Sequence, residues 1–205
     1  MCNGGADGYT GQTSEVVSPL EIATFVSGLL SVWLTVRQNI WCWPAGITMV
    51  LCYGVLAFQV RLYSDVGLQL IYLVMQIYGW YHWLHGGRDR GTLPVTTVGL
   101  WPLAAWILIG LAAAGVLGVV MSTCTDADLP YWNAMTTALS LVAQWFLARK
   151  KLESWAIWIT VDVLYIGMFV TKRLYLMACL YAVFLVLSGM GFHEWRKSLR
   201  ETVSA

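Results

Sequence analysis

The chain has 205 residues, of which 59% are hydrophobic and 11% charged, and its mean hydropathy is +0.66. Soluble domains carry roughly 25% charged residues, so this composition excludes an ordinary soluble protein and predicts an integral membrane protein. The net charge of +1, without a long block of Lys or Arg, gives no electrostatic basis for binding nucleic acid.

Seven apolar stretches are long enough to cross a hydrocarbon core of about 30 Å as helices. Helices are expected because backbone polar groups in lipid must be satisfied within the segment. The stretch before them, residues 1–18, is rich in Gly, Ser and Thr and lacks Lys and Arg, which predicts a disordered tail rather than a signal peptide. The sequence therefore predicts an all-α membrane protein with spans at 19–36, 41–59, 65–84, 98–120, 131–148, 154–171 and 174–192.

Local signals support these boundaries. Pro19 follows Ser18 at the first helix, Asn39 is placed to cap the second, and Asp65 is expected in the first turn of the third, where a carboxylate suits the helix dipole. The Gly- and Pro-containing segments 85–94 and 124–130 are predicted loops.

An internal repeat relates the two halves of the chain at an offset of 112, which pairs Arg37 with Arg149. The spans and tail therefore divide into a first three-helix repeat at 19–84, a linker helix at 98–120, a second repeat at 131–195 and a C-terminal tail at 196–205. Three spans invert the chain and the linker inverts it back, so the two repeats are parallel, related by an axis along the membrane normal. The further matched pairs are Trp43 and Trp155, Ile47 and Ile159, Tyr53 and Tyr165, 61–63 and 173–175, Gly79 and Gly191, and Trp83 and Trp195.

The basic residues predict the orientation of the chain. Nine of them fall on one side of the predicted spans and three, Arg61, Lys172 and Arg173, on the other. By the positive-inside rule the side with nine is cytoplasmic, which places the N-terminus outside and the C-terminus inside.

Polar and aromatic residues share faces on four of the predicted helices, at spacings of three or four positions. Amides can bond hydroxyls or a carboxamide, and aromatic rings can stack on a planar or cationic ring, so these faces predict a cavity for a polar, planar molecule. The candidates are Asn133, Thr137, Ser140 and Gln144; Gln69, Tyr72, Gln76 and Trp83; Trp155, Trp158, Asp162, Tyr165 and Phe169; and Trp43, Gly46, Val50 and Tyr53.

Asp162 is the one carboxylate expected near the middle of a span, where an acid costs about 2.5 to 3.5 kcal/mol, so it should have a partner or a task. Substrate binding, a structural role and a proton relay are all open. The competing interpretation of the whole set is that hydroxyls and amides hold helices together and aromatic rings form interfacial belts. No catalytic motif, cofactor motif or metal-ligand spacing is found, so neither enzymatic chemistry nor a metal is expected.

Four segments resemble the PnuC family of bacterial nicotinamide riboside transporters: NIWCWPAGI at 39–47, LYSDVGLQLIY at 62–72, YGWYHW at 78–83, and SLVAQWFLARKKLESWAIWITVDVLYI at 140–166. The resemblance implies a three-plus-one-plus-three helix arrangement similar to that of sugar-transporting SWEET proteins. It also implies a homotrimer in the bacterial inner membrane, facilitated diffusion of nicotinamide riboside, trapping by a cytoplasmic riboside kinase, and supply of NAD synthesis. Ligand contacts are expected from Trp43, Tyr53, Gln69, Tyr72, Gln76, Asn133, Gln144, Trp155, Trp158, Asp162 and Tyr165.

Other functions remain open at this point. Relatives that resemble the family carry thiamine or riboflavin, so the cargo is open to another vitamin. An ion-coupled carrier working through Asp162, a non-transporting membrane subunit and a membrane enzyme are further alternatives.

Overall fold

The computed structural model describes residues 18–87, 91–124 and 129–204. The predicted tail at 1–18 lies outside these residues except for Ser18. Within the described part the chain forms seven α-helices, and the prediction of an all-α chain with seven helices is confirmed. The helices are α1 Pro19–Val36, α2 Cys42–Gln59, α3 Tyr63–His85, α4 Leu100–Cys124, α5 Pro130–Ala148, α6 Glu153–Thr171 and α7 Tyr175–Ser204.

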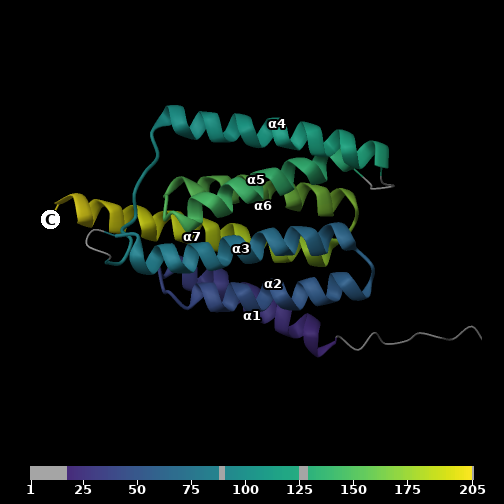
Figure 1. The fold of residues 1–205 in the computed structure, drawn as a ribbon, viewed down its shortest axis with the longest axis horizontal. Coiled ribbons are helices and arrows are strands. Elements are labelled where there is room, and N and C mark those ends of the chain that lie inside the picture. Colours follow the sequence, from purple (N-terminus) through teal and green to yellow (C-terminus); the bar gives the residue numbers. More distant parts are fainter. Residues whose placement is uncertain (1–17, 88–90, 125–128, 205) are drawn as a thin grey trace, which may run out of the picture.

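Every helix starts within two residues of its predicted position, and the largest difference is at the end of the chain. The span expected to end at 192 continues as one helix to Ser204. The added turns contain Arg196, Lys197 and Arg200. Arg and Lys are good helix formers, so the helix continues past the apolar stretch that set the predicted end. The C-terminal segment therefore extends α7 beyond the bundle, as Figure 1 shows.

The local start signals are found in the structure with one change. Ser18 caps α1 through a capping box, in which its side chain accepts from the backbone N–H of Glu21 and the Glu21 side chain accepts from the N–H of Ser18. Asp65 lies in the first turn of α3. Asn39 does not cap α2 directly, because its side chain accepts from the N–H of Trp41, one residue before that helix begins.

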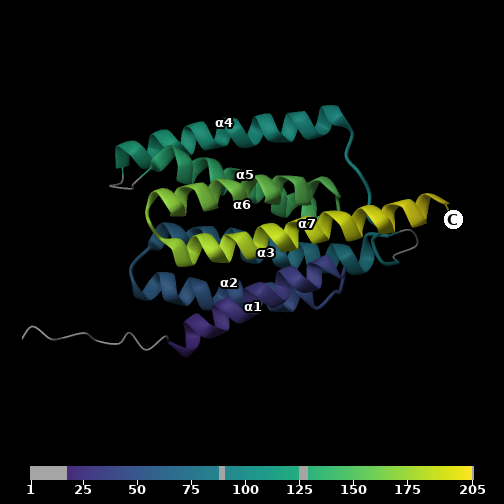
Figure 2. The same cartoon turned by 180° about the vertical axis from the view of Figure 1, so that it is seen from behind.

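The helices pack as an elongated bundle with their axes roughly along its length (Figures 1 and 2). Within each half the first helix contacts the second and the second contacts the third, α1 with α2 with α3 and α5 with α6 with α7. Between the halves α1 contacts α7 and α3 contacts α5, and α4 packs on α5 at one edge. The contacts between the halves are equivalent under exchange of the two halves.

The turns within the two halves have the same backbone geometry at equivalent positions of the repeat. Gln38 and Lys150 have φ of 54° and 55°, and Arg61 and Arg173 have φ of 61° and 58°. Left-handed φ is uncommon for residues other than Gly, so its recurrence at the same offset shows that both halves close their helical turns in the same way.

One end of the bundle collects most of the basic residues and is called the basic end below. It is the end at which α1, α3, α5 and α7 finish and α2, α4 and α6 begin. Its described basic residues are Arg37, Arg149, Lys150, Lys151, Arg196, Lys197 and Arg200.

Four tryptophans pack together inside the basic end and form the tryptophan cluster. Trp43 meets Trp83 edge to face at 5.2 Å between ring centroids, and Trp155 meets Trp195 in the same way at 5.4 Å. Trp83 and Trp195 are 5.7 Å apart and join the two pairs. All four rings are buried, so this end of the bundle is closed by packed side chains.

The tryptophan cluster also bonds each half to the other. The indole Nε1 of Trp83 donates to the carbonyl of Leu147 at 3.2 Å, and that of Trp195 donates to the carbonyl of Thr35 at 3.1 Å. Thr35 and Leu147 are themselves repeat equivalents, so the two bonds are equivalent. Each repeat therefore satisfies a carbonyl near the end of the first helix of its partner repeat.

Five helices, α1, α2, α4, α6 and α7, are long and apolar enough by themselves to span a membrane among the described residues. α3 and α5 fall short because they carry the polar faces noted above. These two helices contact each other across the two halves, and α5 is covered by α3, α4 and α6. Their buried polar residues, Gln76, Thr136, Ser140 and Gln144, therefore lie inside the bundle, where lipid does not reach them.

Candidate functional site

The contact between α3 and α5 brings the two predicted amide residues to one level of the bundle. The Tyr72 hydroxyl of α3 interacts with the side chain of Ser140 on α5. Gln76 and Gln144 follow one turn later on their helices, on the same faces as Tyr72 and Ser140. Both helices run toward the basic end, so the two amides are one turn closer to it.

Neither amide has a hydrogen-bond partner among the described residues. Gln76 is 7% exposed and Gln144 is 5% exposed. Many buried hydroxyls form hydrogen bonds, but these two amides form none within the described residues. The amide atoms are not among the fully enclosed polar atoms that lack a partner, so they keep some accessible surface and are placed to bond a polar molecule that enters the bundle.

A glycine on α2 makes room for one of these amides. A Cβ added at Gly46 would lie 2.5 Å from Nε2 of Gln76. Any residue larger than Gly at position 46 would displace the amide, and the repeat equivalent of this position holds Trp158 instead. At this level the first half therefore has a glycine on α2 beside an amide on α3. The second half has an indole on α6 at the position equivalent to the glycine.

Asp162 has a protein partner on α7. The Ser188 hydroxyl donates to Asp162 Oδ2 at 2.9 Å, and Asp162 is 3% exposed. Ser188 is the repeat equivalent of Gln76 and Asp162 that of Val50, so the pair lies in the second half at the level that Gln76 occupies in the first. This bond satisfies one oxygen of the buried Asp162 carboxylate and holds the side chain in a fixed position.

Tyr53, Tyr165 and Tyr181 lie in the half of the bundle away from the basic end. Tyr165 and Tyr181 are 4.5 Å apart between ring centroids, and Phe169 stacks beside both. The hydroxyl of Tyr165 interacts with Thr136 on α5. Tyr53 of α2 donates its hydroxyl to Asp65 Oδ2 at 3.2 Å, close to the start of α3.

Helices α3, α5, α6 and α7 supply a set of inward-facing polar side chains that we call the central polar cluster. It offers amides, one carboxylate, hydroxyls and aromatic rings within an otherwise apolar bundle. Such a set can hold a molecule that combines a flat ring with several hydroxyl or amide groups. Its members are Gln76, Gln144, Tyr72, Ser140, Asp162, Ser188, Tyr165, Thr136 and Tyr181.

The structure places the remaining predicted contacts in two other environments. Trp43 and Trp155 are fully buried in the tryptophan cluster and lie on Gly79 and Gly191, where an added Cβ would overlap the indoles. Packing accounts for these two rings, although neither Nε1 has a hydrogen-bond partner among the described residues. Their contact with a ligand stays a prediction.

Gln69 is half-buried on α3, and its described neighbours are on α2 rather than the amides. It lines an apolar hollow of about 250 Å³ with Val50, Gly54 and Phe58. Tyr53 is partly exposed, while Asn133 and Trp158 are half-buried on α5 and α6. Trp158 packs against the apolar residues around Phe146 and Val161. The structure thus brings Tyr72, Gln76, Gln144, Asp162 and Tyr165 together, and ligand contact by any of the eleven predicted residues stays a prediction.

Ser188 and Tyr181 were not among the residues expected from the sequence. Both sit on α7, an apolar helix whose isolated hydroxyls carry no face pattern. The offset of 112 contains a signal for them, because it aligns Ser188 with Gln76 and Tyr181 with Gln69. Applying the repeat to each candidate would have found both.

The chain matches the protein family described as nicotinamide mononucleotide transporter over residues 18–197. The nicotinamide riboside transporter PnuC of Escherichia coli (strain K12) is 25% identical over 222 residues, with 96% of this chain and 90% of the relative covered. The riboflavin/roseoflavin transporter RibM of Streptomyces davaonensis is also 25% identical, over 83% of this chain and 81% of its own length.

A solved structure has the same fold. It is a crystal structure of the vitamin B3 transporter PnuC, with a TM-score of 0.71 at 20% identity, and it covers 89% of this chain and 82% of its own. The relatives are transporters, in agreement with the expectation that the chain is not an enzyme.

Proposed function

Because this chain belongs to the nicotinamide mononucleotide transporter family, we propose that it carries nicotinamide riboside across the membrane by facilitated diffusion. The resemblance seen in the sequence motifs is thereby confirmed at the level of the family. The cargo is supported by the name of the Escherichia coli relative and by the chemistry of the central polar cluster.

The observation that carries this proposal is the pair of buried, unpaired amides Gln76 and Gln144. Nicotinamide riboside has a carboxamide and three hydroxyls, each of which can exchange bonds with a glutamine amide. Its ring is cationic and flat, which suits Tyr72 and Tyr165 as stacking partners and Asp162 as a counter-charge. In this assignment the ligand replaces the missing bonds of the two amides.

The proposed transport step is an exchange between two states of the parallel halves. The tryptophan cluster closes the basic end, while the tyrosines stand in the opposite half of the bundle. Opening the basic end requires the indoles of Trp83 and Trp195 to separate and their bonds to the other half to break. A passive carrier needs similar affinity in both states, because a ligand strongly favouring one state would hold the protein there.

We further propose the cellular setting expected from the sequence. The basic end faces the cytoplasm of a bacterium, which places the N-terminus outside and the C-terminus inside the inner membrane. The chain is proposed to act as a homotrimer and to supply a cytoplasmic riboside kinase that traps the substrate for NAD synthesis. These statements rest on the family resemblance and on the distribution of basic residues.

Calorimetric titration of the detergent-purified protein tests the cargo and the site together. Nicotinamide riboside should bind, and Gln144→Leu should weaken it by about tenfold or more, because the variant replaces an amide by an apolar side chain of similar volume. Gln59→Leu, at the exposed end of α2, is the matched control and should bind as the wild type does. Equal affinity in the two variants would move the site away from α5.

Another vitamin is the second candidate, favoured by the similarity to a riboflavin/roseoflavin transporter. Parallel titrations with thiamine, riboflavin and nicotinamide discriminate between the cargoes. Binding of thiamine or riboflavin without binding of the riboside would keep the fold and site and replace the proposed cargo. Absence of binding for all four would favour a non-transporting subunit.

A further inference from the structure

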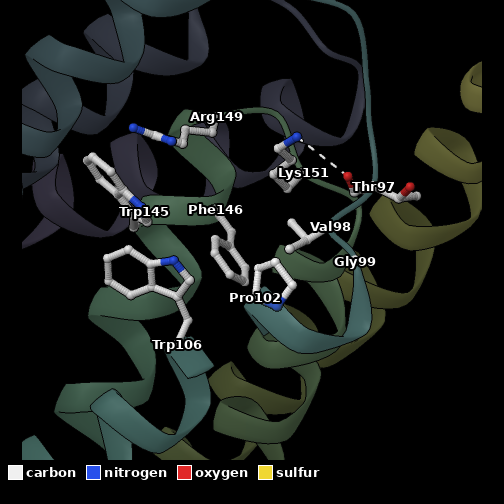
Figure 3. Close-up of a pocket in the computed structure, with 9 residues that line it drawn as sticks. All are labelled: Thr97, Val98, Gly99, Pro102, Trp106, Trp145, Phe146, Arg149 and Lys151. Atoms are coloured by element: carbon white, nitrogen blue, oxygen red, sulfur yellow. Dashed lines mark hydrogen bonds between the residues drawn. The ribbon is translucent and has the colours of Figure 1, made fainter. Parts of the chain in front are cut away.

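A second polar site lies outside the central polar cluster, on the outer face of the basic end. It is a hollow of about 280 Å³ between the segment leading into α4 and the end of α5 (Figure 3). Two cations, Arg149 and Lys151, lie along one side of it, and apolar rings lie opposite. Its lining residues are Thr97, Val98, Gly99, Pro102, Trp106, Trp145, Phe146, Arg149 and Lys151.

Arg149 lies over an aromatic ring beside this hollow. Its guanidinium carbon lies 4.3 Å from the ring centroid of Trp145, and Trp145 in turn stacks on Tyr78 at 5.3 Å with an interplanar angle of 14°. A guanidinium stacked on an indole keeps its in-plane N–H donors free for an oxygen ligand. The aromatic stack therefore presents a preorganised anion donor.

Lys151 is oriented from the other side. Its Nζ donates to Thr96 Oγ1 at 2.8 Å and to the Thr97 carbonyl at 3.5 Å. The segment that leads into α4 is hydrogen-bonded to the α5–α6 turn through backbone groups. The Thr96 N–H donates to the Lys150 carbonyl, and the Thr96 carbonyl accepts from the Leu152 N–H. The ammonium is thus fixed at the rim by neutral oxygens.

No carboxylate among the described residues neutralises the two cations at the hollow. Glu153 is the nearest acid in sequence, but its Oε1 accepts from the Val98 N–H at 2.8 Å and its Oε2 is buried without a hydrogen-bond partner among the described residues, so it makes no bond to either cation. Within the same part of the chain neither Arg149 nor Lys151 has an ion pair, and no acid lines the hollow. The hollow therefore has donors for an anion without a protein anion to occupy them.

The surroundings of the hollow are those of a membrane interface. Leu100 and Trp101, at the start of α4, are 83% and 88% exposed, and in the chain they lie between Gly99 and Pro102, which line the hollow. Trp106 and Trp145 are 6.0 Å apart and put two more amphipathic rings at the same level. Trp beside Arg or Lys at a helix end is the pattern of residues that meet lipid headgroups.

We propose that this hollow binds the phosphate of an anionic glycerophospholipid. Arg149 and Lys151 contact the phosphate oxygens, and Pro102, Trp106 and Phe146 contact the glycerol and the upper acyl chain. The lipid joins α4 to α5 and to the segment that is bonded to the α5–α6 turn. α4 contacts little else than α5, so the lipid would hold this helix in place.

Native mass spectrometry of the full chain in detergent tests the site with phosphatidylglycerol as the probe. The wild type should retain phosphatidylglycerol in preference to phosphatidylcholine. Arg149→Gln with Lys151→Gln should lower the affinity about thirtyfold, equivalent to about 2 kcal/mol at about 1 kcal/mol per basic residue. The matched control is Arg37→Gln with Lys197→Gln, which removes one Arg and one Lys from the same end and should retain the lipid.

Arg37 is a stringent control because it is the repeat equivalent of Arg149 and lies over its own indole, Trp33, at 5.6 Å. Equal lipid loss in the two double variants would show a general charge effect and overturn the site. Competition by millimolar inorganic phosphate as effective as the lipid would show a free-phosphate site and overturn the lipid assignment.

Folding can be controlled separately. Arg149 is exposed, so the single variant Arg149→Glu should keep the melting temperature of the lipid-free protein and still lose phosphatidylglycerol. A folded Arg149→Glu variant that retains the lipid as well as the wild type does would refute the proposal.

Discussion

The tryptophan cluster predicts a large cost for the smallest possible substitution at two glycines. A Cβ at Gly79 would lie 2.1 to 2.6 Å from three benzo-ring atoms of Trp43, and one at Gly191 would lie 2.5 to 2.6 Å from three atoms of Trp155. Both indoles are fully buried against other tryptophans, so neither can rotate away freely. Alanine at either position must push an indole out of place.

The expected magnitude follows from two opposing effects. Alanine in place of glycine in a helix normally stabilises by about 1 kcal/mol. Overpacking a filled core costs about 1 to 3 kcal/mol, and more where the neighbour is a rigid ring. The helix-propensity gain is the same at an open position on the same helix and cancels, so Gly79→Ala and Gly191→Ala should be destabilised by about 1 to 3 kcal/mol or more relative to alanine there.

The chain offers such open positions. Gly67 on α3 and Gly189 on α7 have no atom within 4 Å of an added Cβ. The assay is the midpoint of thermal unfolding in detergent, with Gly67→Ala compared with Gly79→Ala and Gly189→Ala compared with Gly191→Ala. Replacing Trp43 by Phe removes the overlapping atoms and should recover most of the loss in Gly79→Ala. Equal midpoints for test and control variants, or no recovery with Trp43→Phe, would refute the packing described for this end.

Three further outcomes follow from single polar groups. Burial lowers the pKa of the Lys150 ammonium, which donates to the Leu93 carbonyl, below its ordinary 10.5. Between the lowered pKa of the folded state and pH 10.5, the unfolded chain therefore binds more protons than the folded one. The free energy of unfolding should rise as the pH increases through this interval. In denaturation measured as a function of pH, Lys150→Met should lack this rise. Ser188→Ala leaves Asp162 Oδ2 without its donor and should cost about 1 to 3 kcal/mol in thermal unfolding, whereas Thr160→Ala, at an exposed site of α6, should cost much less. In proteoliposomes, uptake of the riboside should not respond to an imposed pH gradient. If wild-type uptake does respond and the response disappears in Asp162→Asn, transport is coupled to protons through Asp162 and is not facilitated diffusion.

The sequence was sufficient for the number, type and approximate bounds of the helices. Their lengths are dictated by the bilayer and their backbone bonds are internal, so runs of mainly apolar residues bounded by turn residues predict them. It was also sufficient for the offset of 112, because Arg61 and Arg173 or Trp83 and Trp195 stand in register along the chain. Gln76, Gln144 and Asp162 could be selected because amides and acids are rare and costly within spans.

What only the tertiary structure decided is which of these groups meet. Trp43 and Trp155 have the composition of a stacking site, yet they pack on Gly79 and Gly191, a contact between helices that no spacing within one helix encodes. Ser188 is an isolated hydroxyl in an apolar helix, which could bond its own backbone, and it gains a role only because α6 presents Asp162 opposite to it. Similarly, Trp83 and Trp195 each donate to the other half of the molecule, far away along the chain. Helix length and periodicity are local properties, whereas the partner of a buried polar group depends on helix packing, and that packing was settled only in three dimensions.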